Sequence, residues 1–114
     1  TNQERIQEGL EPLSISKAAE AAAAVRAEEI VSSFSHTRPN GSNFSTALKE
    51  QGASYRTSGE NIAWGQKTPE EVVTGWMNSS GHRANILNSK FTSIGVGVYR
   101  SSSGRLYWVQ FFTG

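Results

Sequence analysis

The chain has 114 residues, of which 36% are hydrophobic and 18% charged, so it can bury one core and gives no sign of a second. A net charge of +1, with no basic stripe or cluster along the sequence, argues against nucleic acid as a partner. The absence of cysteine excludes disulfides and thiolate-bound metals. All ten acidic residues are glutamates, which excludes a Ser-His-Asp triad and an aspartic dyad. No apolar run approaches the roughly 20 residues that span a bilayer, and the first residues have no signal-peptide pattern.

Two helices are predicted at the start of the chain. The first, near 2–8, has capping-box spacing between Thr1 and Glu4 and ends before Gly9. The second is an Ala-rich helix over 16–33, whose flat Ala face favours close packing of another element. Three charged side chains are expected on the solvent side of this helix: Arg26, Glu28 and Glu29.

Three further helices follow. One is expected over 42–51, with Ser42 as its N-cap. Thr68, followed by proline and two glutamates, is a dense start signal for a helix that runs through Met77. Ser80 is then expected to cap a short final helix.

The last third of the chain changes to the period of β-strands. Ile94, Val96 and Val98 alternate, a Ser-rich turn follows, and a second apolar stretch over 106–112 completes a β-hairpin. A third strand is expected over 55–63. Both faces of the last strand carry large apolar side chains, so helices are expected on both faces of the sheet.

These elements predict an α+β fold, a three-layer α-β-α sandwich. Its small antiparallel sheet of about three strands is covered by helices on both faces, and residues 1–114 form one domain. Gly95 and Gly97 lie on the face opposite the alternating apolar residues, where missing side chains leave room for a helix or for a pocket floor. Close packing of a helix is the favoured explanation.

Three residues are candidates for chemistry. The chain has two histidines, His36 and His82, and neither lies on an evident apolar face. Glu60 is the one acidic residue within a strand-like stretch, and a strand Glu requires a partner. Two imidazoles and a carboxylate could hold zinc with positions left open for water. Because the chain has no HExxH or other local ligand pair, a hydrogen-bonded structural His pair is the alternative.

Two other candidates have a simpler explanation. Glu71 occupies the position of a capping box, where its carboxylate would bind the backbone N–H of Thr68. Ser79 and Ser80 could suggest a nucleophile, but the surrounding residues are not a GxSxG elbow and no Asp is present to orient His82. Helix capping accounts for these residues better.

Several motifs resemble the bacterial branch of the CAP superfamily, which includes cysteine-rich secretory proteins and pathogenesis-related proteins. They occur in the order seen in that family: RIQEGLEPL, AAAAVRAEEI, FSHTRPNGS, GENIAWG, GHRANIL, IGVGV and YWVQFF. The resemblance covers nearly the whole chain, and the pairing of GENIA with GHRAN is specific. It implies an α-β-α sandwich, in agreement with the elements predicted above.

The resemblance also implies a cleft lined by two His and two Glu. His36, Glu60 and His82 match three of these positions, and in several relatives the two His bind a divalent cation. Zinc is the first candidate, magnesium and calcium are alternatives, and no organic cofactor is expected. Where many eukaryotic relatives carry the second Glu, three residues after the helix Trp, this chain has Ser79. Glu70 or Glu71 is the alternative source of this carboxylate, although both lie a turn or more before Trp76.

A secreted or cell-surface bacterial protein is what the resemblance implies. We expect a monomeric, non-enzymatic binding module whose partner is an extracellular protein, a cell-wall ligand or a lipid, with no transmembrane segment. Two alternatives stay open. One is a metal-dependent hydrolase in which Glu60 acts as base on a peptide or cell-wall substrate. The other is a lipid- or sterol-binding module, which would need an exposed apolar groove.

Overall fold

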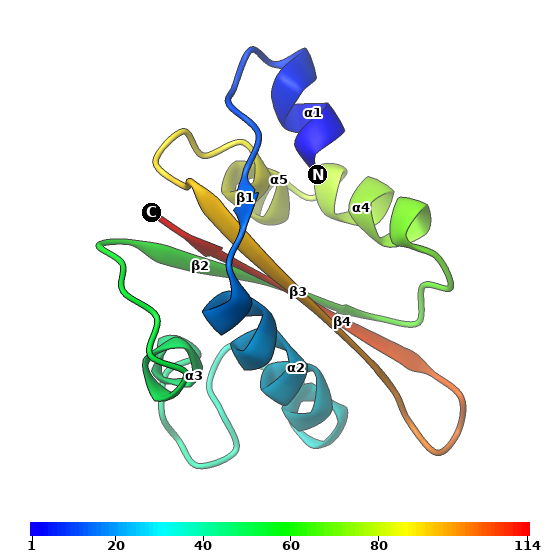
Figure 1. Ribbon diagram of the computed structural model, residues 1–114. Helices are drawn as coiled ribbons and strands as arrows, with labels where there is room; N and C mark the ends of the chain where they lie inside the picture. Colours follow the sequence, from blue (N-terminus) through cyan, green and yellow to red (C-terminus); the bar gives the residue numbers. More distant parts are fainter.

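Five helices and four strands make up the protein, described over residues Thr1–Gly114 by a computed structural model (Figure 1). The helices are α1 (Asn2–Gln7), α2 (Lys17–Ser32), α3 (Ser45–Glu50), α4 (Pro69–Met77) and α5 (Ser80–Ile86). The strands are β1 (Ser14–Ile15), β2 (Ser58–Trp64), β3 (Ser93–Arg100) and β4 (Leu106–Thr113). None of the helices combines the length and apolar character that a membrane crossing requires.

The strands form one sheet in the order β1-β3-β4-β2. The predicted hairpin is confirmed as β3 and β4, and the third predicted strand as β2, which pairs antiparallel with β4. The expectation of a purely antiparallel, three-stranded sheet is wrong, because β1 pairs parallel with β3, with Ser14 opposite Ser93. A strand of two residues is too short to show an alternating pattern in the sequence. Strand β2 therefore forms one edge of a four-stranded mixed sheet.

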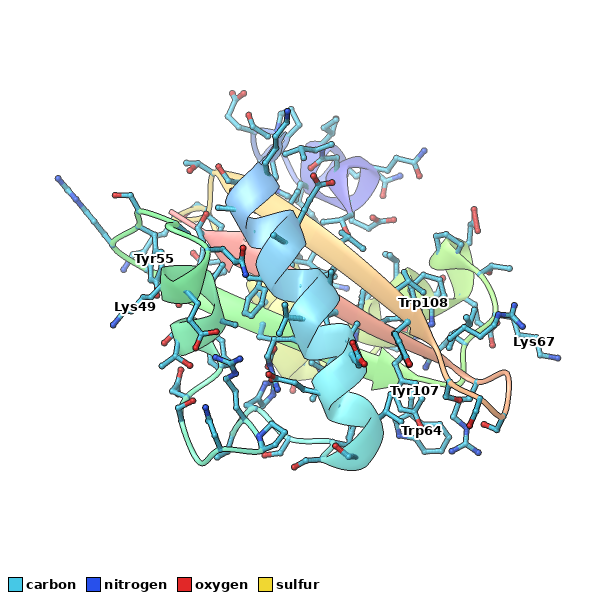
Figure 2. The ribbon with its side chains drawn as sticks, turned by 60° about the horizontal axis from the view of Figure 1, so that its bottom comes forward. Lys49, Tyr55, Trp64, Lys67, Tyr107 and Trp108 are labelled. Carbon is cyan, nitrogen blue, oxygen red and sulfur yellow. The ribbon has the colours of Figure 1, made fainter.

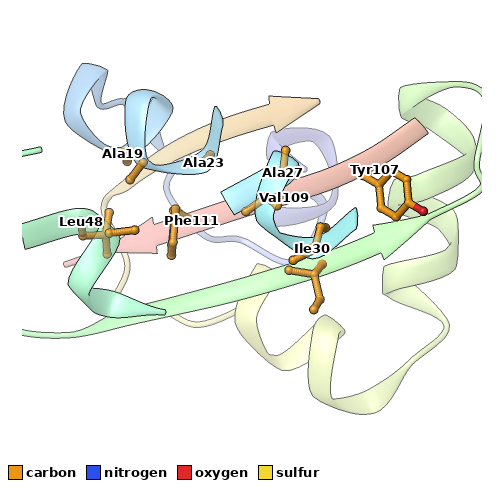
Figure 3. Packing of buried hydrophobic residues seen from close by; sticks show 11 residues of the cluster. Ala19, Ala23, Ala27, Ile30, Leu48, Tyr107, Val109 and Phe111 are labelled. Atoms are coloured by element: carbon orange, nitrogen blue, oxygen red, sulfur yellow. The ribbon is translucent and has the colours of Figure 1, made fainter. Parts of the chain in front are cut away.

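Helices cover both faces of the sheet, as predicted. Helix α2 lies across one face (Figure 2), with α3 beside it, and Figure 3 shows its alanines packed over Val109 and Phe111 of β4. On the other face, Trp76 of α4 and Ile86 of α5 join the cluster that includes Trp108 of β4. The cover on this face is incomplete, since two β3 side chains remain about half exposed: Val96 at 46% and Val98 at 48%.

Two glycines of β3 set how closely α2 approaches the sheet. A Cβ built on Gly95 would lie 2.1 Å from the carbonyl carbon of Ala19, and one on Gly97 would lie 2.4 Å from that of Ala23. Real Cβ atoms do not approach backbone so closely, so the predicted close packing of a helix over these glycines is confirmed. The small alanines of α2 complete this contact from the other side.

The predicted cap of α4 is confirmed, and α2 has a cap that was not predicted. Ser16 accepts a 3.2 Å hydrogen bond from the backbone N–H three residues ahead in α2. At α4, Thr68 Oγ1 accepts a 3.1 Å bond from the N–H of Glu71. At α1 the predicted capping box is only half formed. Glu4 Oε1 lies 2.8 Å from the Thr1 nitrogen, but the Thr1 hydroxyl makes no capping bond and instead accepts a bond from Gln110.

The predicted caps of α3 and α5 are wrong. Helix α3 begins at Ser45 instead of 42, and the Ser42 hydroxyl bonds to the Asn40 side chain within the preceding turn. Short polar side chains readily make such local bonds outside helices. Helix α5 includes Ser80, so that Ser79 occupies the capping position, where it makes no side-chain bond to the helix.

Alanine substitution of the β3 glycines tests the packing of α2. Gly95→Ala should lower the free energy of unfolding by about 1–3 kcal/mol or more, because the added methyl group meets the α2 backbone. Gly75→Ala is the matched control, since its Cβ meets nothing within 4 Å in α4, and it should leave stability unchanged or raise it by about 0.5–1 kcal/mol. Urea denaturation measures both; equal effects of the two substitutions would contradict the packing described.

Candidate functional site

The site is built on a buried ion pair between Glu60 of β2 and Arg26 of α2. Arg26 Nε lies 2.8 Å from Glu60 Oε2, and Arg26 Nη2 lies 3.1 Å from Glu60 Oε1, so the contact is bidentate. Neither side chain has any exposed surface. The prediction that Arg26 lies on the solvent side of its helix is therefore wrong. The expected partner of the strand glutamate is this arginine.

The same carboxylate also holds His36. Glu60 Oε1 lies 2.8 Å from His36 Nδ1, while 54% of the His36 side chain is exposed. A carboxylate engaged by arginine can only accept, so Nδ1 carries the proton of this bond. The neutral ring then keeps the lone pair on Nε2, which is free to bind a ligand.

A second arginine anchors the loop that carries His36. Arg38 makes a bidentate contact with Glu29, at 2.7 Å from Nη2 to Oε2, and its Nη1 lies 2.8 Å from Glu50 Oε2. The hydrogen bonds that Arg38 donates to these two glutamates raise its pKa, so it stays charged. Arg26 Nη1 also contacts Glu29, at 3.0 Å. The chain of contacts from Glu50 to Glu60 thus contains three carboxylates and two guanidinium groups, which leaves one negative charge in excess beside His36.

His82 is positioned by the residue that follows Glu60 in β2. Asn61 Nδ2 donates a 3.1 Å hydrogen bond to the backbone carbonyl of His82 in α5. Asn85, also in α5, donates to Asn61 Oδ1 at 2.9 Å and to the Glu60 carbonyl at 3.3 Å. Neighbouring residues of the edge strand therefore hold the two histidines, one from each helical layer.

The environment of His82 favours its neutral form. Burial lowers the pKa of His82 below its ordinary value of 6.5, and the charge of His36 lowers this pKa further. The hydrogen bonds agree with this, because neighbouring residues of β2 hold the two histidines, Glu60 holding His36 and Asn61 holding His82. Neutral His82 keeps a lone pair on one ring nitrogen.

The sequence did not single out Arg26, Asn61 or Asn85, which complete this site. For the two asparagines a signal existed, because each lies within a motif that also contains a candidate residue, Asn61 after Glu60 and Asn85 after His82. Asn61 is fully buried, and a buried amide requires hydrogen-bond partners.

Glu71 and Ser79 take no part in this network. Glu71 is exposed at the start of α4, and its carboxylate accepts a 3.0 Å bond from the N–H of Lys67, one residue before the predicted partner Thr68. Its role is still local to the helix start. Ser79 is partly buried and directly precedes α5.

The donor set fits a two-imidazole cation site and does not fit a structural zinc site. Structural zinc takes four protein ligands, and no three His, Cys, Asp or Glu side chains converge in this structure. Both oxygens of Glu60 are already engaged by Arg26 and His36. Magnesium and calcium prefer oxygen donors, so an imidazole pair suits zinc-like cations better. Neither histidine lines any of the three cavities of the protein; His36 is exposed and His82 is half-buried.

Removing Arg26 should show how much stability the protein loses when the Glu60 carboxylate is buried without its partner. We expect Arg26→Met to lower the free energy of unfolding by about 3–5 kcal/mol, because Glu60 is left buried and without its main partner. The double variant R26M/E60Q should lose less than the sum of the single variants, by about 0.5–3 kcal/mol. Arg83→Met, which breaks an exposed pair with Glu8, is the control and should cost under about 1 kcal/mol. Strict additivity in urea denaturation would contradict the pairing.

The lowered pKa of His82 makes stability depend on pH. Because the unfolded chain binds this proton more readily, the stability from neutral His82 is present above about pH 6.5 and is lost as the pH falls through the folded-state value. NMR titration should give His82 a pKa below 6.5, and His36→Gln should raise it part of the way back. A His82 pKa of 6.5 or more, or one unaffected by His36→Gln, is the contrary result.

The sequence of the chain matches a known protein family. Residues 1–112 match the sequence model described as the CAP, cysteine-rich secretory protein family. The chain is 47% identical over 116 residues to the uncharacterised protein YkwD of Bacillus subtilis, covering 100% of this chain and 44% of that protein. It is 38% identical over 79 residues to the uncharacterised membrane protein YlbC of the same organism, covering 69% of this chain and 21% of that protein. The chain thus spans less than half the length of these relatives.

Solved structures agree with this match. An extracellular protein with an SCP domain from Bacillus anthracis superposes with a TM-score of 0.90 at 30% identity, covering 98% of this chain and 37% of the other. An outer surface protein from Borrelia burgdorferi has the same fold, with a TM-score of 0.88 at 22% identity, covering 98% of this chain and 84% of the other. From the family match, the sequence identity and the shared fold together, the chain belongs to the CAP, or cysteine-rich secretory protein, family.

Proposed function

We propose that this chain is an extracellular binding module in which His36 and His82 together bind a zinc-like divalent cation. The observation that carries the proposal is the 2.8 Å contact between Glu60 and His36 Nδ1. Histidines that bind metals usually donate their other ring N–H to a carboxylate or carbonyl, which fixes the ring and raises its basicity as a ligand. His36 has this arrangement before any cation arrives.

Electrostatics support the same proposal. The excess negative charge of the Glu50–Arg38–Glu29–Arg26–Glu60 network lies next to His36 and attracts a cation. The lowered pKa of His82 keeps that imidazole neutral, which is the form that binds a metal. Water or donor atoms of a partner would complete the coordination. With two protein ligands, the affinity would be modest and the cation exchangeable.

Binding is a better reading than catalysis because of how Glu60 is used. A general base must reach its proton with a free oxygen, whereas both Glu60 oxygens are held by Arg26 and His36. For the hydrolase alternative, the chain thus offers no carboxylate in the role first considered. The lipid alternative gains no support either, since the three cavities are lined mostly by polar residues.

An extracellular location is part of the proposal. It is supported by two of the structural relatives, one described as an extracellular protein and the other as an outer surface protein. A cation bound at the exposed His36 ring would also be accessible to partners outside the cell.

Isothermal titration with zinc chloride tests the site. The double variant H36Q/H82Q should bind at least about 100-fold more weakly, since both nitrogen donors are lost. Glu60→Gln should weaken binding by about 10- to 100-fold, because it loosens the orientation of His36. Glu11→Gln, an exposed acidic residue in no ion pair, is the control and should bind like the original protein. Stoichiometric zinc on H36Q/H82Q would refute the assignment.

A further inference from the structure

A second polar site lies at the C-terminal end of β2. A cavity of about 540 Å³ opens between the loop after β2 and the turn of the β3–β4 hairpin. Three cations line it: Lys67, Arg100 and Arg105. Lys67 is distant in the sequence from the two arginines, and four uncharged residues separate Arg100 from Arg105, so no basic cluster was evident in the sequence. Figure 2 shows Lys67 at this end of the molecule, near Trp64 and Tyr107.

The three cations lack acidic partners. None of them takes part in an ion pair, and no acidic residue lines the cavity. The Glu71 carboxylate accepts a bond from the backbone N–H of Lys67, but Glu71 does not line the cavity. By contrast, Arg26 and Arg38 are each paired with glutamates. Positive charge is thus gathered in a concave site without compensation.

Hydrogen bonds hold the walls of this cavity in place. The indole N–H of Trp108 donates a 3.0 Å bond to the carbonyl of Gln66, which fixes the loop after β2. Across the hairpin turn, the N–H of Ser101 donates a 2.9 Å bond to the carbonyl of Arg105. The Arg105 guanidinium lies over the ring of Trp64, 4.4 Å from its centroid. A site held in this way loses little freedom when a ligand binds.

Gln66 supplies an independent sign of a missing partner. Its Oε1 atom is buried and has no hydrogen-bond donor, and such atoms are rare in folded proteins. Gln66 also lines the cavity. A hydroxyl group on a bound molecule is therefore a candidate donor to this oxygen. The wall therefore combines charges for an anion with an acceptor for a neighbouring hydroxyl.

We propose that this pocket binds a soluble phosphate ester that carries hydroxyl groups, such as a phosphorylated sugar or polyol. The guanidinium groups of Arg100 and Arg105 can donate hydrogen bonds to phosphate oxygens, and Lys67 adds a third positive charge. A phosphate dianion interacts with several cations more favourably than a singly charged carboxylate does. A lipid headgroup is disfavoured, because the hairpin turn is serine-rich and Leu106 is the one hydrophobic residue of the lining. The site is separate from the histidine pair and independent of its function.

NMR titration at low ionic strength is the test. Glucose 6-phosphate, glucose and inorganic phosphate are added to the ¹⁵N-labelled protein, to R100Q/R105Q and to K49Q/R56Q. The last variant removes two exposed cations elsewhere, and Figure 2 shows Lys49 on the opposite side of the molecule from Lys67. A parallel arm measures binding to vesicles of phosphatidylglycerol and phosphatidylcholine. Circular dichroism confirms that each variant is folded.

Glucose 6-phosphate should give saturable shifts confined to residues 65–67 and 100–106. Its affinity should exceed that of phosphate, fall at least about tenfold in R100Q/R105Q and remain unchanged in K49Q/R56Q. Glucose should not bind. Absence of saturable shifts, or equal weakening in both variants, would overturn the proposal. Tighter binding to the phosphatidylglycerol vesicles than to glucose 6-phosphate would overturn the choice of a soluble ester. If R100Q/R105Q does not fold, Lys67→Gln takes its place, with a smaller expected loss.

Discussion

The buried contact between Arg26 and Glu60 is the constraint on which the rest of the structure depends. Removing two charges from water costs several kcal/mol per ion, and their mutual attraction offsets this only with near-complete hydrogen bonding. Arg26 meets that condition, since it also donates to Glu29 and to the carbonyl of Ser35. These contacts tie helix α2, the edge strand β2 and the loop that carries His36 into one arrangement. The main effect of the ion pair is therefore to position these elements, and its net contribution to stability is smaller.

Much of the fold could be predicted from local patterns. The capping residues Ser16 and Thr68 mark where α2 and α4 begin, because an N-cap is a contact within four residues of sequence. Gly95 and Gly97 indicated a close helix, since a glycine face on a strand leaves space that packing must fill. The pairing of β3 with β4 followed from alternation on both sides of a short turn. Each of these signals is local, so no knowledge of the tertiary structure was needed.

Arg26 was not predicted as the partner of Glu60 because its charge, and not its position in the helical repeat, was taken as the guide to its environment. The buried positions of α2 follow helical spacing: Ala19, Ala22, Ala23, Arg26, Ala27 and Ile30. Arg26 lies within this stripe, but its charge suggested solvent. An arginine within an apolar helix stripe and a glutamate within a buried strand each need a buried partner of opposite charge, so the two together predict an ion pair. Strand β1, by contrast, gave no signal, since its two residues depend wholly on pairing with β3. That neighbouring residues of β2 hold His36 and His82 also needed the fold, because the two histidines come from different helical layers.

The protonation of His36 offers the most direct measurement of the central claim that Glu60 orients this ring for binding. Long-range ¹H–¹⁵N NMR at pH 8.5 distinguishes which ring nitrogen carries the proton. The contact of 2.8 Å predicts that Nδ1 is protonated and Nε2 is free, and that Glu60→Gln weakens this preference. A His36 protonated on Nε2 in the original protein, or one that is unchanged by Glu60→Gln, would contradict the account.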